Sequence, residues 1–253
     1  MPVLTAAQRA HFRTKGWLVV PEVFPSHVVK AIGELAWRVG EQAAAEPGVR
    51  RIDVEGTIEG RAVPRKVRLP FLAHRDFRKF VLNRRLVNLV SELLGGRAMV
   101  FWDHIFMKPP RIGSPTYYHQ DNFDFRCTPK QKMLTAWIAL DDVDEENGCL
   151  RYISGSNRER LYPHGPVPEA PSRLGVSDRF IDYSREEPAP VPKGGVVFHS
   201  SHTLHSSRET TSDRWRRGYA ACSSRGGRSR RRSAPSRSSR NRASHRRGSR
   251  PDP

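Results

Sequence analysis

The chain has 253 residues, enough for one large domain or two small ones, and a formal net charge of +18. That charge would ordinarily indicate a polyanion partner, but residues 222–253 hold eleven arginines and one aspartate, and so carry +10 of it. Three scattered cysteines without CxxC spacing, no signal-peptide pattern and no apolar run of about 18 residues exclude a disulfide framework and a membrane span, so we expect a cytoplasmic protein.

The first part of the chain is predicted to be helical. Residues 5–8, TAAQ, fit a capping box that opens a short helix, and Ser26 can cap a second helix with apolar residues at helical spacing. Asp76 can cap a third helix, whose apolar stripe would end at Gly95-Gly96.

After Gly96 the sequence favours short strands. Runs such as AMVFWDHIFM, MLTAWIALDDV and GGVVFHS are rich in β-branched and aromatic residues and are separated by turn signals. Asn147-Gly148 lies between two such runs and predicts a β-hairpin, while residues 162–193 hold seven prolines and are predicted to form a long loop that lines a site. Helices followed by many strands indicate an α+β fold with a mainly β core.

From Cys222 onward the chain becomes low-complexity Arg/Ser sequence, which cannot bury a core. We therefore predict a globular domain over residues 1–221 and a disordered tail over residues 222–253. Because the change falls inside a strand-like segment, three interpretations remain open: a basic arm for nucleic acid or membrane, an inert tail, or an out-of-frame translation of the true C-terminus. Nucleic-acid binding is expected only through this tail.

A histidine and an aspartate two residues apart occur in YHQDNFDF, at His119 and Asp121. If this aromatic run is a strand, both side chains point to one face, with Cα atoms about 6.5 Å apart, and can converge on one metal ion. The alternative is a surface strand with two polar side chains. The same spacing at His74 and Asp76 is a decoy, because Asp76 is expected to cap a helix.

A third ligand is available in GGVVFHSSHTLHSS, which contains His199, His202 and His205. On a strand, His199 and His205 share one face and His202 lies on the other, so the three cannot all bind one metal. Two histidines and one carboxylate on one side of an ion leave the opposite positions open, as in non-haem Fe(II) oxygenases. The same set can hold a catalytic zinc with one open position.

The order of these motifs resembles the phytanoyl-CoA dioxygenase (PhyH) family. The segments that carry the resemblance are YHQDNFDF, LTAWIALDDVDEENGCLRYISGSN, GGVVFHSSHTLHSS and RWRRGYA, together with LTAAQRAHFRTKGWLVVPEVF near the N-terminus. The resemblance implies a double-stranded β-helix (a jelly-roll, cupin-like fold) with flanking N-terminal helices. It also implies Fe(II), 2-oxoglutarate and O₂, and hydroxylation of a small organic substrate with release of succinate.

The resemblance also implies site residues. His119, Asp121 and His205 match the family's metal ligands. Arg216 follows His205 at the family's spacing of about eleven residues and would bind the distal carboxylate of 2-oxoglutarate, a task that suits a planar, permanently charged guanidinium. Further cosubstrate contacts fall on Ser207, Trp137 and Lys66, although Trp137 can equally be an ordinary core residue.

The last strand is where the sequence departs most from the family, because the Arg/Ser composition begins soon after Arg216. We therefore expect a short or frayed strand there, and a catalytically impaired family member is one alternative. A zinc hydrolase with the same three ligands and a non-enzymatic nucleic-acid binder are the others. The sequence predicts neither the substrate nor the oligomeric state.

Overall fold

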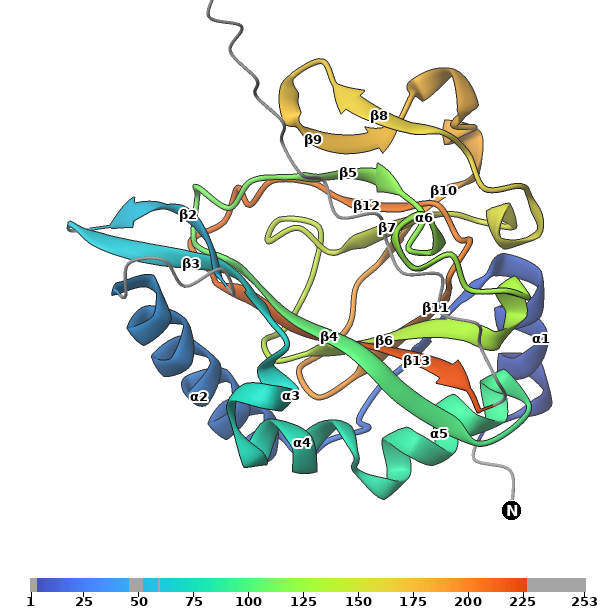
Figure 1. The fold of residues 1–253 in the computed structure, drawn as a ribbon, viewed down its shortest axis with the longest axis horizontal. Helices are drawn as coiled ribbons and strands as arrows, with labels where there is room; N and C mark the ends of the chain where they lie inside the picture. The colour runs from blue at the N-terminus through green and yellow to red at the C-terminus, as the bar shows by residue number, and fades with distance from the viewer. Residues whose placement is uncertain (1–3, 46–51, 59, 227–253) are drawn as a thin grey trace, which may run out of the picture.

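The computed structural model shown in Figure 1 describes residues 4–45, 52–58 and 60–226. The predicted tail therefore lies almost entirely outside the described residues, and its three interpretations stay open. Two facing antiparallel sheets and a layer of helices make up the fold.

The larger sheet has seven strands, each antiparallel to its neighbours. In spatial order these are β1 (Trp17–Val20), β11 (Val196–Ser200), β6 (Met133–Ala139), β13 (Arg216–Arg225), β4 (Ala98–Lys108), β3 (Arg61–Arg68) and β2 (Ile52–Ile58).

The smaller sheet has four antiparallel strands and faces the larger one (Figure 1). Its order is β10 (Glu186–Ala189), β7 (Leu150–Ile153), β12 (His205–Ser207) and β5 (Thr116–His119). A separate hairpin of β8 (His164–Val167) and β9 (Ala170–Val176) packs against β5. The predicted mainly β jelly-roll with flanking helices is confirmed.

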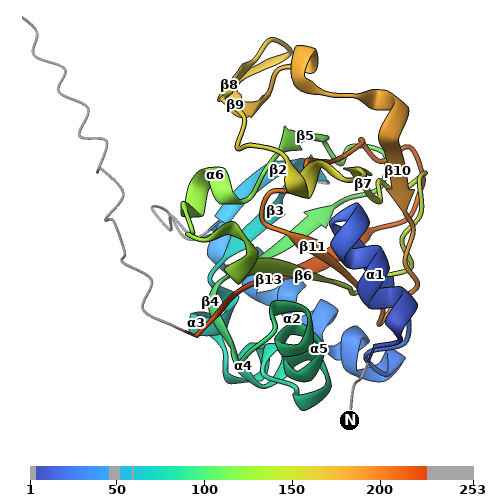
Figure 2. The same ribbon diagram turned by 90° about the vertical axis from the view of Figure 1, so that its right-hand side faces the viewer.

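The helices lie mostly outside the larger sheet. They are α1 (Ala6–Lys15), α2 (Ser26–Ala45), α3 (Pro70–Ala73), α4 (Arg75–Val81), α5 (Arg84–Leu94) and the short α6 (Asn122–Phe125), with 3₁₀ turns at Lys130–Lys132, Ser156–Arg158, Asp178–Phe180 and Tyr183–Arg185. Helices α2, α4 and α5 cover the outer face of the sheet (Figures 1 and 2). In the described part of the chain, none of these helices combines the length and apolarity needed to cross a membrane.

Side chains along each strand of the larger sheet alternate between its two faces, and the two faces contact different parts of the molecule. Ile138, Phe198 and Tyr219 point outward and pack with helix residues such as Phe80 in the main apolar core. Their neighbours in sequence point inward, toward the smaller sheet, where apolar residues such as Trp137 share the interior with polar side chains. The outer face therefore stabilises the fold, and the inner face is free to build a site.

Several local predictions are confirmed and others are corrected. The capping box at Thr5 is present, and Gly95 ends α5 in the left-handed conformation. The predicted single third helix is in fact two helices, because His74 caps α4 by accepting from the Asp76 amide and Asn83 caps α5 by accepting from the Arg85 amide. Asp76 is thus inside a helix and does not cap it.

Two loop predictions are wrong in a way that matters for the site. Asn147-Gly148 forms a turn, but the strands on either side, β6 and β7, belong to different sheets, so there is no hairpin. Residues 162–193 contain β8, β9 and β10 rather than a structureless loop. The β2–β3 hairpin was not predicted either, although Ile52, Val54 and Ile58 alternate with polar residues along β2.

The last strand also differs from the expectation. β13 runs from Arg216 to Arg225, pairing with β4 over its length and with β6 from Gly218 to Ser224. It continues past Cys222, with a register shift against β4 between Cys222 and Ser223, and the side chains of both residues are buried. The composition change at residue 222 therefore does not shorten the strand that carries Arg216.

Candidate active site

The three predicted ligands come from three different segments. His119 ends β5 and lies directly opposite His205 of β12 in their antiparallel pair, with ring centroids 4.1 Å apart. Asp121 is beyond the end of the strand, in helical conformation at the start of α6. The two-residue spacing thus does not work through a shared strand face, as expected, but through a tight turn that folds the carboxylate back under the two imidazoles.

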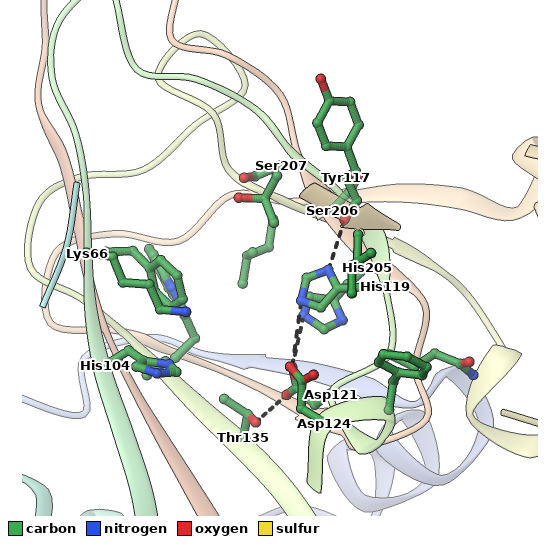
Figure 3. Close-up of a pocket in the computed structure, with 18 of the residues that line it drawn as sticks. Lys66, His104, Tyr117, His119, Asp121, Asp124, Thr135, His205, Ser206 and Ser207 are labelled. Atoms are coloured by element: carbon green, nitrogen blue, oxygen red, sulfur yellow. Dashed lines mark hydrogen bonds and ion pairs between the residues drawn. The ribbon is translucent and has the colours of Figure 1, made fainter. Parts of the chain in front are cut away.

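The ligand atoms form a compact set. Asp121 Oδ1 lies 3.7 Å from Nε2 of both His119 and His205, and all three ligand atoms lie within 4.8 Å of one another (Figure 3). Two atoms 3.7 Å apart can both lie about 2.1 Å from one ion, the usual metal–nitrogen distance. The donor set fits a facial site of two histidines and one carboxylate.

The protonation of both histidines is also suited to metal binding. His119 Nδ1–H donates to the carbonyl oxygen of Tyr117, and His205 Nδ1–H donates to that of Thr203, each at 2.9 Å. A carbonyl can only accept, so each ring must carry its proton on Nδ1. The lone pairs of Nε2 therefore point into the site, and the backbone fixes both ring orientations.

The second oxygen of Asp121 is held by residues that do not bind the metal. Thr135 donates its hydroxyl to Oδ2 at 2.5 Å, and His199 Nε2 lies 3.1 Å from the same oxygen. Tyr152 OH lies 2.9 Å from His199 Nδ1, which accepts the phenol proton when Nε2–H donates to the carboxylate. Asp121 therefore offers one oxygen, Oδ1, to an ion and keeps the other for the protein.

Burial and neighbouring groups shift the pKa values of Asp121 and His205. Burial alone would raise the pKa of Asp121, but the hydrogen bond from His199 and the nearby imidazoles lower it well below its usual value. Burial lowers the pKa of His205 well below 6.5, reinforced by His119 and His199. Both groups are consequently in the metal-binding state at neutral pH: the carboxylate ionised and the imidazole neutral.

The ligands line a cavity of about 440 Å³ between the two sheets. All seven residues that the sequence assigned to the site line this same cavity: Lys66, His119, Asp121, Trp137, His205, Ser207 and Arg216. The structure thus brings together residues from β3, β5, β6, β12 and β13.

Arg216 is buried and oriented. Its Nε and Nη2 donate to the Gly148 carbonyl at 2.9 and 2.8 Å, which leaves three of its five N–H donors for a ligand. Its guanidinium carbon lies 5.0 Å from the centre of the Trp137 ring. Gly218 makes room for that ring, since a Cβ there would lie 1.9 Å from Trp137 Cζ2. Burial lowers the pKa of Arg216 to about 10, so it stays charged at neutral pH.

The wall opposite the imidazoles carries Lys66 and His104 (Figure 3). Lys66 Nζ lies 5.0 Å from the centre of the Phe106 ring, and burial lowers its pKa. His104 Nε2 accepts from Trp102 Nε1–H at 2.6 Å, which places the His104 proton on Nδ1. Burial lowers the pKa of His104 to about 3, so this neutral imidazole is a hydrogen-bond donor.

Sequence reasoning missed several of these roles. The shared parity of His199 and His205 indicated that His199 faces the site, but its contact with Asp121 depends on the turn after β5. Thr135 and His104 gave no signal, because their places at the cavity depend on strand pairing between segments that are distant in sequence. His74 and Asp76 lie at the start of α4, outside the cavity, and His202 also lies outside it, with Nε2 2.9 Å from Asn122 Nδ2.

Comparison with known proteins adds to this geometry. The chain is 31% identical over 144 residues to a 2-aminoethylphosphonate dioxygenase from an uncultured bacterium (57% of this chain, 52% of the relative). It is 31% identical over 165 residues to a probable alpha-ketoglutarate-dependent hypophosphite dioxygenase from Stutzerimonas stutzeri (62% and 57%). The chain thus spans about half the length of these curated relatives.

A solved structure shares the architecture. The non-haem alpha-ketoglutarate-dependent carbocyclase SnoK from nogalamycin biosynthesis superposes with a TM-score of 0.70, at 27% identity, covering 88% of this chain and 85% of that one. The family profile for phytanoyl-CoA dioxygenase (PhyH) matches residues 12–218, which include all three predicted ligands and Arg216. With the two-histidine, one-carboxylate set assembled at the position of its motifs, the chain belongs to the phytanoyl-CoA dioxygenase family.

Proposed function

We propose that this chain is an Fe(II)- and 2-oxoglutarate-dependent dioxygenase that hydroxylates a small organic molecule. The observation that carries the proposal is the meeting of His119, Asp121 and His205 in one cavity that also contains Arg216. A metal held by three ligands on one face has its other positions available for a bidentate keto acid and O₂.

The chemistry that a bound Fe(II) and 2-oxoglutarate supply is oxidative decarboxylation of the keto acid to succinate, coupled to hydroxylation of a C–H bond. The residues of this chain hold and orient the reactants. Arg216 would donate its free N–H groups to the distal carboxylate of the keto acid, with Ser207 and Lys66 as further contacts. Trp137, pressed against Gly218, forms the wall beside that carboxylate.

Asp121 helps to determine how many positions stay open. Thr135 and His199 both hold Oδ2, so the carboxylate would offer a metal ion Oδ1 alone. Its presence also favours hydroxylation, since halogenases related to the family replace this carboxylate with a small residue. The neutral imidazole of His205 needs no proton loss to bind the metal at neutral pH.

The relatives' names point to small molecules, among them 2-aminoethylphosphonate, so the proposed substrate of this chain is a small organic molecule. A cytoplasmic location is a further proposal, supported by three free cysteines, as expected in a reducing compartment. A zinc hydrolase is less favoured, because its reaction needs no 2-oxoglutarate carboxylate to bind the free N–H donors of the buried Arg216.

The test is succinate formation from 2-oxoglutarate in air, with the purified chain supplied with Fe(II) or with Zn(II). We expect the wild-type chain to form succinate with Fe(II) and not with Zn(II), and we expect Asp121→Ala to form none with either metal. Equal activity of wild type and Asp121→Ala would contradict the ligand assignment. No succinate from a folded wild-type chain that binds Fe(II) would instead support the catalytically impaired family member.

A further inference from the structure

Two hairpins from different parts of the chain meet at the cavity that contains the metal ligands. The β2–β3 hairpin contributes Arg65, and the β8–β9 hairpin contributes Arg173 (Figures 1 and 2 show the hairpins). The loop between β4 and β5 joins them: Arg173 donates to Ser114 Oγ at 2.9 Å and to the Pro115 carbonyl at 2.7 Å, and the Ser114 amide donates to Glu55 at 2.8 Å. Glu55 in turn forms an ion pair with Arg65.

The charges lining this cavity do not balance. Five cationic side chains line it, Arg65, Lys66, Arg68, Arg173 and Arg216, against the lining carboxylates Asp53, Asp121 and Asp124; Glu55, outside the lining, pairs with Arg65, which leaves one positive charge in excess. A ferrous ion and a 2-oxoglutarate dianion carry opposite charges of equal size, so loading the site leaves the excess of positive charge unchanged. The loaded cavity therefore favours an anionic occupant.

Most of the cations have a counter-charge. Arg68 pairs with Asp53 at 2.6 Å and Arg65 pairs with Glu55 at 2.9 Å, while the cosubstrate carboxylate is assigned to Arg216 with Lys66 as a further contact. Arg173 is different: its partners Ser114 and Pro115 are neutral acceptors, and within the described ranges no carboxylate lies within 4.0 Å of its guanidinium. It is a half-buried, oriented cation that lacks an anion.

Arg173 also lies close enough to Arg65 to disfavour its charge. The pKa of Arg65 is lowered first by burial and second by Arg173, and the attraction of Glu55 only partly offsets this. Two guanidinium groups from separate hairpins are thus held near each other at a cavity wall. Such a like-charge arrangement is costly unless an oxyanion accepts hydrogen bonds from both.

We propose that Arg173, together with Arg65, forms a subsite for an anionic group of the substrate, an oxyanion such as a phosphonate, phosphate or carboxylate. This inference rests on the proposed oxygenase function for its placement beside the metal. An anion held between the hairpins would leave the rest of the substrate to extend toward His119 and His205. The subsite thereby selects small acids over neutral molecules of the same size.

The probe is methylphosphonate, titrated calorimetrically under anaerobic conditions into the full chain loaded with Fe(II) and saturating 2-oxoglutarate. Loss of a charge-assisted hydrogen-bonded contact costs enough to weaken binding about ten- to a hundredfold. We expect that loss in Arg173→Gln and partial retention in Arg173→Lys. The matched control is Arg179→Gln, which makes the same charge change on an exposed arginine that stacks on Phe180 outside this cavity.

Four outcomes would overturn the subsite. They are no saturable binding to the wild-type chain, unchanged binding to Arg173→Gln, an equal loss in Arg179→Gln, and competition between methylphosphonate and 2-oxoglutarate, which would place the anion in the cosubstrate site. Failure of the proposed function is distinguished beforehand, because the chain then shows no Fe(II)–2-oxoglutarate absorption band. In that case the same titrations of the metal-free chain still decide whether Arg173 binds an oxyanion.

Discussion

Asp121 has two carboxylate oxygens with separate tasks. Oδ1 faces the Nε2 atoms of His119 and His205, and Oδ2 accepts from Thr135 and His199. This division fixes the carboxylate before any metal arrives, so binding requires little reorganisation. The residue types and their order were predictable from the sequence, whereas the division between the two oxygens was not, because it depends on contacts between segments far apart in the chain.

His199 can be tested as the residue that orients this carboxylate. In His199→Leu the hydrogen bond to Oδ2 is lost, and we expect Fe(II) affinity to fall about ten- to a hundredfold, the usual cost of removing a partner of a metal ligand. His199→Gln keeps an N–H donor and should retain most of the affinity. Anaerobic metal titration measures both, and equal affinities in wild type and His199→Leu would show that the contact has no orienting role.

His104 gives the molecule a pH dependence of known sign. Its pKa is about 3 in the folded chain because of burial, against 6.5 when unfolded, so between these values the unfolded chain binds more protons. Stability from this group is therefore present above pH 6.5 and is lost progressively as the pH falls toward 3. In His104→Gln, whose amide can still accept from Trp102, this loss is absent.

Urea unfolding of the metal-free chain at pH 7.5 and pH 5 measures the effect. The wild-type chain should lose more stability than His104→Gln over this interval, because only wild type has an imidazole to protonate at this position. An equal loss in the two proteins would mean that His104 is protonated in the folded state.

At the scale of elements, strand β13 determines how far along the chain the folded sheet extends. It carries Arg216 near one end, and its far end, from Cys222 to Ser224, pairs with both β4 and β6. A central strand with partners on both sides cannot be removed without exposing two strands. The folded sheet thus extends past the predicted boundary at residue 221, as far as Arg225.

Two truncations test this. A chain ended after Gly226 keeps all of β13, and we expect its melting temperature and cooperative unfolding to match those of the full chain. A chain ended after Ala221 removes the paired residues 222–225, and we expect it to lose cooperative unfolding or melt at least several degrees lower. Equal melting temperatures for the two truncated chains would show that this end of the strand contributes nothing.

Prediction of elements succeeded where the signal was local. The capping box at Thr5 and the glycine end at Gly95 are set by neighbouring residues, and both are confirmed. Strands β8 and β9, with the sequences HGPV and APSRLGV, show no apolar alternation. They form a hairpin that belongs to neither main sheet and packs against β5. Their structure depends on contacts with residues far away in the sequence, which the periodicity of a single sequence does not predict.

At the scale of the whole molecule, the fold class was predictable and the site only in part. Helices preceding a series of strands, with the family's motifs in order, are enough to predict a jelly-roll and to bring His119, Asp121 and His205 together. The charge excess of the cavity was not predictable, because Arg65 and Arg173 meet only after two hairpins fold against the same loop. The distribution of charge along the sequence indicated only the basic residues 222–253, and not the cavity.

The central claim is that His119, Asp121 and His205 hold one ferrous ion beside a keto acid anchored by Arg216. It is tested most directly by anaerobic titration of Fe(II) and 2-oxoglutarate into the purified chain, watching for the weak visible charge-transfer band of a keto acid bound to ferrous iron. We predict the band in wild type, its absence in His205→Ala, and its appearance in Arg216→Met only at much higher 2-oxoglutarate. A band of full intensity in both His119→Ala and His205→Ala would contradict the account.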